Sequence, residues 1–185
     1  MADTATTRRT ERLELRPVDI TDLDRILEYR NHPEVTRWLI RTEVEPDAFR
    51  AAWRAAADDP HDHSVAVVLD GTVIGTVSLS VDDGMGQPGM PPRTEAHLGY
   101  IFDPAYAGRG YATEAVSAVV AMVFEELGVR RVIAGCYADN TASWRVLEKV
   151  GMRREQHGVQ DSWHAELGWV DGYTYGILVD EWRAR

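Results

Sequence analysis

Cysteine is nearly absent from this sequence, since Cys136 is the single one among 185 residues. An internal disulfide needs two cysteines and a cysteine-rich zinc site needs several, so neither can stabilise this chain. Long apolar runs are missing as well, because the longest one near the middle, 118–124, is far shorter than the roughly 20 residues that span a bilayer. The opening segment has two arginines but no apolar stretch of a secretory signal. These absences predict a cytoplasmic protein that does not enter a membrane.

Positive charge is also scarce, with 20 Lys and Arg residues against 30 Asp and Glu residues and a net charge of −10 at pH 7. Such a surface repels a phosphate backbone and attracts cations. The charge therefore disfavours DNA or RNA as the main partner and favours a cationic or amine-bearing molecule. The 44% hydrophobic and 27% charged residues are typical of a soluble globular protein, and the length suits one domain with its own core.

Hydrophobic periodicity predicts alternating helices and strands over most of the chain. Residues 1–10 are small and polar and are expected to form a disordered tail, which leaves 11–185 as a single domain. Helices are expected after an N-cap at Thr21, from Glu45, and over 111–127 and 141–149. Strands are expected at 13–17, 64–69, 72–80, 96–102, 131–137, 152–156 and 172–179, with a hairpin turn at Asp70-Gly71. This order predicts an α/β fold built on a mixed sheet.

One segment joins a strand, a glycine-rich turn and the most regular amphipathic helix of the chain. Gly108 and Gly110 bracket Arg109 just before the helix expected to begin at Tyr111. Glycine lets backbone N–H groups approach a ligand closely, and a helix N-terminus carries roughly half a positive charge. The turn therefore predicts a site for a phosphate or pyrophosphate. It matches neither the dinucleotide-binding glycine pattern nor the Walker pattern, and a glycine-rich turn without a ligand is the alternative.

Several segments together resemble the GNAT acetyltransferase superfamily, in particular the branch related to ribosomal-protein N-terminal acetyltransferases of the RimJ/RimL type. The phosphate loop of that family aligns with AGRGYA at 107–112. The other matching segments are TERL at 10–13, RNHPEV at 30–35, GY…P at 99–104, ATEA at 112–115, and the set Asn140, Ser143, Lys149 and Gly151. Ala107 departs from the Gln or Arg that the family usually has, so weaker phosphate binding is expected.

The resemblance implies a GNAT-type fold, with a strongly twisted mixed sheet, splayed parallel central strands and helices on both faces. It implies acetyl-CoA as co-substrate, lying between the splayed strands 96–102 and 131–137, and it implies no metal. The pantetheine arm would pair with the first strand, and the pyrophosphate would lie on the glycine turn. The implied cofactor-binding residues are Ile101, Phe102, Asp103, Ala107, Gly108, Arg109, Gly110, Tyr111, Ala112, Thr113, Asn140 and Ser143.

Direct transfer of an acetyl group to an amine makes three chemical demands. The amine must lose a proton, the tetrahedral oxyanion must meet a donor, and the leaving thiolate must be stabilised. The resemblance implies that the backbone N–H of Ile101 serves the oxyanion and that the hydroxyl of Ser143 serves the thiolate. No acyl-enzyme is required, so Cys136 need not act as a nucleophile.

His97 and Glu95 are the candidates for the general base. Strand alternation places both on one face, and histidine is the side chain that most readily exchanges a proton near neutral pH. His97 is the first choice, because it stands where this branch often carries an acidic residue, and Glu95 is the second. A packing or surface histidine is the alternative. Trp38 follows the first helix and is expected to line the acceptor site, unless it belongs to the core.

Two classes of function stay open on the sequence alone. The first is an N-acetyltransferase that acts on a protein N-terminal amine or a small-molecule amine, and the second is a non-catalytic acyl-CoA-binding or sensing protein of the same fold. The negative charge disfavours an aminoacyl group on RNA as acceptor. The His61-Asp62-His63 run is expected to be a polar loop rather than a metal site. Homodimers are common among similar proteins, and the sequence leaves the oligomeric state open.

Overall fold

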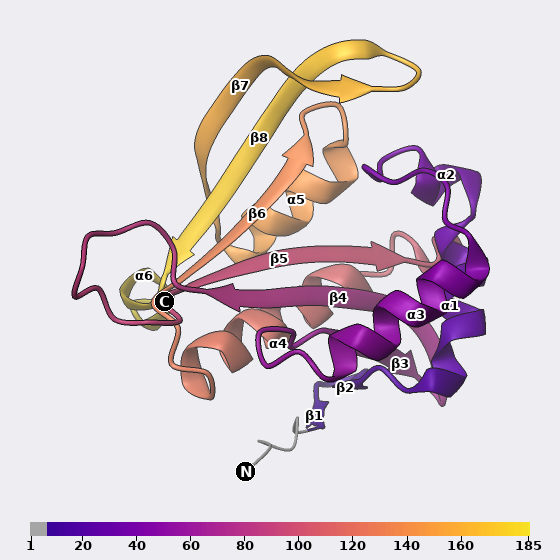
Figure 1. Ribbon diagram of the computed structural model, residues 1–185, viewed down its shortest axis with the longest axis horizontal. Coiled ribbons are helices and arrows are strands. Elements are labelled where there is room, and N and C mark those ends of the chain that lie inside the picture. Colours follow the sequence, from indigo (N-terminus) through magenta and orange to yellow (C-terminus); the bar gives the residue numbers. More distant parts are fainter. Residues whose placement is uncertain (1–6) are drawn as a thin grey trace. The chain divides into compact units, whose positions relative to one another are not determined.

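The computed structural model describes residues 7–185 and shows a mixed α/β architecture (Figure 1). The strands are β1 (Arg8–Arg9), β2 (Glu14–Pro17), β3 (Val65–Leu69), β4 (Thr72–Asp82), β5 (Glu95–Phe102), β6 (Arg131–Tyr137), β7 (Arg153–His164) and β8 (Gly168–Leu178). The helices are α1 (Leu23–Arg30), α2 (Pro33–Thr36), α3 (Pro46–Ala57), α4 (Tyr111–Glu125), α5 (Thr141–Val150) and α6 (Val179–Arg183), with short 3₁₀ helices at Ile20–Asp22 and Pro104–Tyr106. The described strands follow the order β1-β2-β3-β4-β5-β6-β8-β7, and β5 pairs with β6 in parallel. The predicted mixed α/β fold is confirmed.

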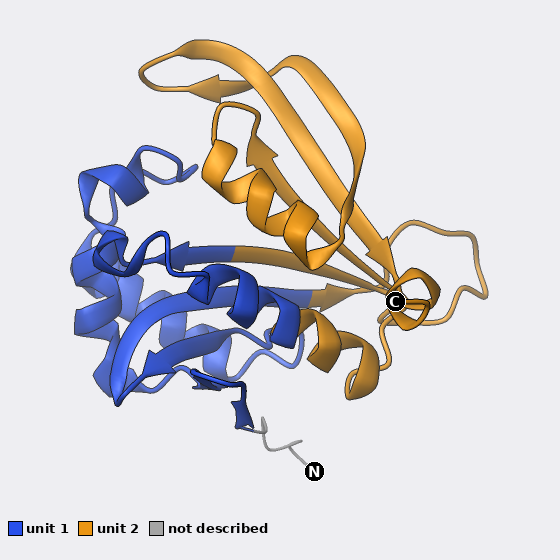
Figure 2. Cartoon of the chain, turned by 180° about the vertical axis from the view of Figure 1, so that it is seen from behind, with its two compact units in different colours: residues 1–80, 100–118 blue, residues 81–99, 119–185 orange. Residues whose placement is uncertain are grey.

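The chain divides into two compact units (Figure 2). The first contains the described residues up to Ser80 together with Tyr100–Ala118, and the second contains Val81–Gly99 and Val119–Arg185. The strands β4 and β5 and the helix α4 each begin in one unit and end in the other. The single domain over 11–185 stays a prediction.

In the first unit, an antiparallel arrangement of β2, β3 and β4 carries the helices α1 and α3. The turn between β3 and β4 has positive φ at Asp70 (48°) and Gly71 (79°), as a two-residue hairpin turn requires, so the predicted hairpin is confirmed. Apolar side chains of α1 and α3 pack against apolar side chains of β3 and β4. This core contains Leu23, Ile26, Tyr29, Phe49, Ala66, Val68 and Val73, and Ile101 at the end of β5 packs against it.

The start of the chain differs from the prediction in two places. Residues 1–6 of the expected tail lie outside the described part of the chain, but Arg8 and Arg9 pair with β2 as a short strand, so the tail prediction is wrong for them. A two-residue strand has no hydrophobic periodicity to predict it, and it is defined only by its pairing with the edge of β2. The expected N-cap at Thr21 is also wrong, because Asp19 caps the first helical turn and accepts the N–H of Thr21 at 2.8 Å.

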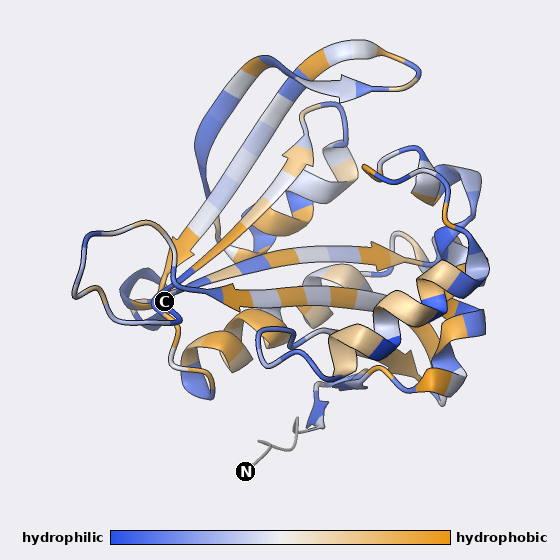
Figure 3. Cartoon of the chain, in the orientation of Figure 1, coloured by the Kyte–Doolittle hydropathy of each residue, from blue (hydrophilic) through white to orange (hydrophobic). Residues whose placement is uncertain are grey.

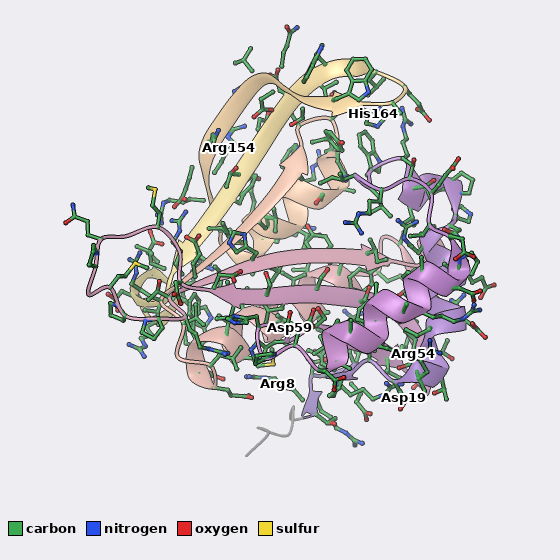
Figure 4. The ribbon with its side chains drawn as sticks, viewed as in Figure 1. Arg8, Asp19, Arg54, Asp59, Arg154 and His164 are labelled. Atoms are coloured by element: carbon green, nitrogen blue, oxygen red, sulfur yellow. The ribbon has the colours of Figure 1, made fainter. Side chains whose placement is uncertain are left out.

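In the second unit, β6 pairs antiparallel with β8 from Arg131↔Leu178 to Tyr137↔Gly172, and β8 pairs with β7 in a long hairpin. The sequence predicted only the inner parts of β7 and β8. Most β7 side chains are exposed, and the hairpin is largely hydrophilic or neutral in Figure 3, so no buried face marks its outer half. His164, labelled in Figure 4, is buried at the end of β7, where its Nδ1 accepts the N–H groups of Glu166 and Leu167.

The long helix α4 and the shorter α5 begin and end close to where the sequence predicts. The core face of α4 consists of Ala115, Val116, Val119, Val120 and Val123, each 0% exposed. Asn140 caps α5, and Gly151 ends it with a left-handed φ of 85°. None of the helices within residues 7–185 has the length and apolar character of a membrane-spanning segment.

Candidate active site

The glycine turn lies in the first unit, directly before α4. Ala107, Gly108, Arg109 and Gly110 are exposed, and α4 begins at Tyr111. The first N–H groups of a helix have no acceptor within the helix, and the dipole of this 15-residue helix favours an anion at the same end. Arg109 adds a cation beside the turn, with its guanidinium 5.7 Å from the centroid of the Tyr106 ring. The local geometry therefore suits the predicted phosphate site.

Both glycines of the turn are required by backbone conformation rather than by crowding. Gly108 has φ 74° and Gly110 has φ 82°, values that side chains with a Cβ rarely adopt. A Cβ on Gly108 would have no described atom within 4 Å, and a Cβ on Gly110 would lie 3.4 Å from Nη2 of Arg12. The surface above the turn is thus open to a ligand.

The end of β5 is held within the first unit by contacts that the sequence did not predict. The carboxylate of Asp103 accepts the N–H of Ala105 at 2.8 Å and pairs with Arg25 of α1. The backbone N–H of Asp103 donates to the carbonyl of Ile74, and its carbonyl accepts the N–H of Tyr106. Asp103 therefore has protein partners for every polar group, and Ile101 and Phe102 are the better candidates for backbone pairing with a ligand.

A cavity of about 520 Å³ in the first unit is a second feature that sequence reasoning missed. Its lining residues are Arg25, Glu28, Tyr29, His32, Glu34, Asp103, Pro104 and Ala105. His32 and Glu34 belong to the RNHPEV segment, which was identified by resemblance but had no assigned role. Arg25 pairs with both Asp103 and Glu28, and Glu34 adds a third carboxylate, so negative charge exceeds positive charge in the cavity lining. Trp38 lies half-buried just after α2, with the guanidinium of Arg37 5.1 Å from the centroid of its ring.

In the second unit, the parallel ladder of β5 and β6 joins Glu95, Ala96 and His97 to Arg131, Val132 and Ile133. The ladder stops at His97, whereas β5 continues to Phe102 and β6 to Tyr137. His97 is therefore the last residue of β5 in this ladder. The splay that the resemblance implied stays a prediction.

The structure brings His97 and Glu95 to one face, as alternation predicted. Their neighbours on the opposite face of β5, Ala96 and Leu98, are buried, whereas the His97 side chain is 51% exposed. Nε2 of His97 lies 3.7 Å from Oε1 of Glu95, but the other carboxylate oxygen of Glu95 accepts Nε of Arg131 at 2.7 Å. Glu95 thus belongs to an ion-pair network, and the more accessible of the two candidates is His97.

That network continues along the second unit, where Arg131 links Glu95 to further ion pairs. Nη2 of Arg131 bonds Glu155 of β7 at 2.6 Å, and Arg153 pairs with the same carboxylate. The hydrogen bond from Arg131 lowers the pKa of Glu155 against the opposing effect of burial, and the Arg153 charge adds to this. Glu95 is one end of a cross-strand charge network that stabilises the sheet.

Asn140 and Ser143 lie together at the start of α5. Oδ1 of Asn140 accepts the N–H of Ser143 at 3.2 Å, so Asn140 is the helix cap. The Ser143 hydroxyl contacts the thiol of Cys136, whose pKa burial raises to about 11 while that contact acts in the opposite direction. A thiol with such a pKa stays protonated, so Cys136 is a poor nucleophile.

Two other polar side chains, those of Tyr137 and Asp62, have structural partners. The Tyr137 hydroxyl donates to the carbonyl of Trp163 at 3.1 Å. Asp62 of the His61-Asp62-His63 run accepts the N–H of Ser64 at 2.8 Å. Within residues 7–185, no three His, Cys, Asp or Glu side chains gather as metal ligands.

Comparison with known proteins defines the class to which this fold and turn belong. Residues 12–153 match the acetyltransferase (GNAT) domain family, and the chain therefore belongs to that family, whose members use acetyl-CoA. An uncharacterized N-acetyltransferase of Bacillus subtilis (strain 168), YnaD, is 29% identical over 176 residues, which are 94% of this chain and 97% of the relative. The resemblance found in the sequence is confirmed, and the chain is an acetyltransferase.

Solved structures agree with this assignment. A GNAT-family acetyltransferase from Bacillus anthracis has a TM-score of 0.79 and 28% identity, covering 95% of this chain and 100% of that one. RimL, a ribosomal L7/L12 alpha-N-protein acetyltransferase in complex with coenzyme A, has a TM-score of 0.81 at 16% identity, covering 95% and 99%. The second likeness shows a shared fold.

Proposed function

We propose that this acetyltransferase moves the acetyl group of acetyl-CoA directly to a primary amine of a cationic acceptor, either a protein N-terminal amine or a small-molecule amine. The observation that carries the proposal is the exposed turn with two positive-φ glycines at the start of α4. Residues 107–113 would bind the pyrophosphate through backbone N–H groups. Ile101 and Phe102 would pair with the pantetheine arm, and Asn140 would hydrogen-bond that arm.

The reaction requires the acceptor nitrogen to attack the thioester carbon, after which the carbon–sulfur bond breaks and the CoA thiolate leaves. His97 would take the proton of the amine, directly or through a water. The backbone N–H of Ile101 would donate to the oxyanion, and the hydroxyl of Ser143 would donate to the departing sulfur. The Ser143 hydroxyl contacts the thiol of Cys136 in the structure, so it would turn from that sulfur to the departing one.

The acidic cavity supports a cationic acceptor. Glu28 and Glu34 line it beside the Arg25–Asp103 pair, and the whole chain carries a net charge of −10. A protonated amine would be attracted to these carboxylates before it loses its proton. Trp38, which follows α2, would line the approach of the acceptor.

The first prediction tests catalysis against mere binding. Acetyl-CoA at one hundred times its dissociation constant should stabilise the folded protein by about 2.7 kcal/mol, because it binds only the folded state. A thermal melt measures this shift, and release of free CoA thiol with a panel of amines and peptides measures turnover. A melting temperature that millimolar acetyl-CoA leaves unchanged would contradict the proposed binding of acetyl-CoA. Stabilisation without thiol release from any acceptor would favour the acyl-CoA sensor.

The second prediction concerns salt. The kcat/KM for the acceptor should fall as salt rises from low to moderate, because screening shortens the reach of the negative surface to about 10 Å at 0.1 M. The KM for acetyl-CoA should stay flat or improve, because CoA is itself an anion.

A matched pair of variants locates the effect. Glu34→Gln removes a charge at the cavity and should raise the acceptor KM, whereas Asp47→Asn removes an exposed charge of α3 and should not. If both variants have the same acceptor KM, or if the acceptor kcat/KM does not change with salt, the negative charge of the protein serves solubility alone.

A further inference from the structure

Arg12 reaches the glycine turn from the short connection between β1 and β2, within the first unit. Its Nη1 donates to the carbonyl of Arg109 at 2.9 Å, inside the turn itself. Its guanidinium also lies over the ring of Tyr111, 4.5 Å from the centroid, at the first residue of α4. Arg12 therefore contacts the turn both at its backbone and at the helix that follows.

The hydrogen bond to Arg109 determines where a neighbouring donor points. A trans peptide is planar, so the carbonyl of Arg109 and the N–H of Gly110 point in opposite directions. Because Arg12 binds that carbonyl, the N–H of Gly110 is directed away from Arg12. The left-handed φ of 82° at Gly110 is the conformation that goes with this peptide orientation. A turn without the bond is free to rotate this peptide and to lose the donor.

Glu114 holds Arg12 in this place. Its Oε2 accepts Nε of Arg12 at 2.7 Å, and its Oε1 accepts the backbone N–H of Arg12 at 2.9 Å and the hydroxyl of Thr10 at 2.5 Å. Burial acts to raise the pKa of Glu114, but the hydrogen bonds from Thr10 and Arg12 outweigh it and hold that pKa below its ordinary value. Glu114 stays ionised and keeps a charge-assisted contact on Arg12.

The same pairing removes an electrostatic conflict. A carboxylate in the first turn of a helix favours the helix dipole but repels a bound anion at the same end. Arg12 neutralises Glu114, so the turn keeps a helix-stabilising carboxylate without a net negative charge next to the phosphate site. The segments TERL and ATEA, both of which carry the family resemblance, meet in this contact.

We propose that Arg12 is a positioning residue for the pyrophosphate turn, held in place by Glu114 and Thr10. Arg12 itself need not touch the ligand, since it acts through the peptide between Arg109 and Gly110. This inference rests on the proposed acetyl-CoA binding, because it names the residue that prepares that site.

Arg12→Ala tests the inference with two probes, CoA and pantetheine, which lacks the pyrophosphate. The variant should weaken CoA binding about tenfold, the scale of one charge-assisted hydrogen bond, and leave pantetheine binding unchanged. In turnover, the KM for acetyl-CoA should rise while kcat and the acceptor KM stay the same. Calorimetry and steady-state kinetics measure these values.

Arg9→Ala is the matched control, because it removes an equal charge from the adjacent strand. Arg9 pairs with Glu14 at 3.0 Å and its side chain is 80% exposed, against 41% for Arg12. Its CoA affinity should equal that of the wild type. If both variants lose the same affinity, long-range charge rather than the bond to Arg109 explains the result, and the inference fails.

Arg12→Lys and Glu114→Gln separate positioning from folding. Lysine keeps the charge but lacks the fork that binds Glu114 and Arg109 together, so Arg12→Lys should resemble Arg12→Ala. Glu114→Gln should loosen Arg12 and weaken CoA binding in the same direction, which tests the inference even if Arg12→Ala does not fold. Normal CoA affinity in folded Arg12→Lys and Glu114→Gln would overturn it. A wild-type protein that binds no CoA would overturn the proposed function, and this inference with it.

Discussion

Turnover by the His97→Ala variant should fall at least tenfold at pH 7, with the KM for acetyl-CoA nearly unchanged. An alkyl ammonium has a pKa near 10, so only about one part in a thousand is free amine at that pH, and a positioned base contributes about 10²–10⁴-fold. His97 is half-exposed and is the last residue of β5 in its ladder with β6. The loss should be partly recovered at high pH, where more of the acceptor is already deprotonated.

Two further variants complete this test. His61→Ala removes an exposed histidine far along the sequence from β5 and should leave kcat unchanged. Glu95→Ala should have a smaller effect on kcat than His97→Ala, because the Glu95 carboxylate is bound by Arg131. If neither His97→Ala nor Glu95→Ala slows turnover more than about threefold, the base lies elsewhere or product release limits the rate.

A pre-steady-state burst distinguishes those two outcomes. A burst indicates that product release is slow, so the loss of the base is hidden. Without a burst, Tyr137 and Asp103 are the next residues to replace, and each would have to leave a present partner, Trp163 or Arg25.

Stabilisation by acetyl-CoA should be largely lost in the Gly110→Ala variant. Gly110 has φ 82°, and an L-residue with a Cβ adopts such a conformation at a cost of roughly 1–2 kcal/mol. Relief of this strain should turn the peptide whose backbone N–H groups would bind the pyrophosphate in the proposed site. The added Cβ would also lie 3.4 Å from Nη2 of Arg12. This close approach would disturb the contact through which Arg12 supports the turn.

Gly128→Ala is the matched control, because Gly128 has φ 64° just beyond the other end of α4 and its Cβ would meet no described atom within 4 Å. Both variants should melt at a lower temperature than the wild type in the absence of ligand. Only Gly110→Ala should lose the shift on adding acetyl-CoA. A Gly110→Ala protein that keeps the full ligand shift would show that the turn is merely structural.

Local rules explain why much of the fold was predictable. The Asp70-Gly71 turn, the amphipathic face of α4 and the left-handed stop at Gly151 each depend on residues that are close in the sequence. The turn at Gly108 and Gly110 is of the same kind, because a glycine pair before a helix is itself the signal for positive φ and open N–H groups. Alternation along one strand likewise placed His97 and Glu95 on one face.

The structural predictions were wrong or incomplete where two residues could give the same local signal, or where the sequence had no such signal. Asp19 and Thr21 both qualify as helix caps, and the structure uses Asp19, which also accepts the Thr21 hydroxyl at 2.7 Å. The outer half of the β7–β8 hairpin has no buried face, so its strands are defined only by pairing with each other.

By itself the sequence determined the mixed α/β class, the family resemblance and the glycine turn, and it proposed the pair of candidate bases. Only the tertiary structure decided how those groups are engaged: Arg131 binds Glu95, Arg25 binds Asp103, and Arg12 binds Glu114 across 102 residues of chain. Each such partner comes from a different element. Periodicity and capping act over a few residues, whereas an ion pair depends on where the folded sheet and its helices bring distant side chains together.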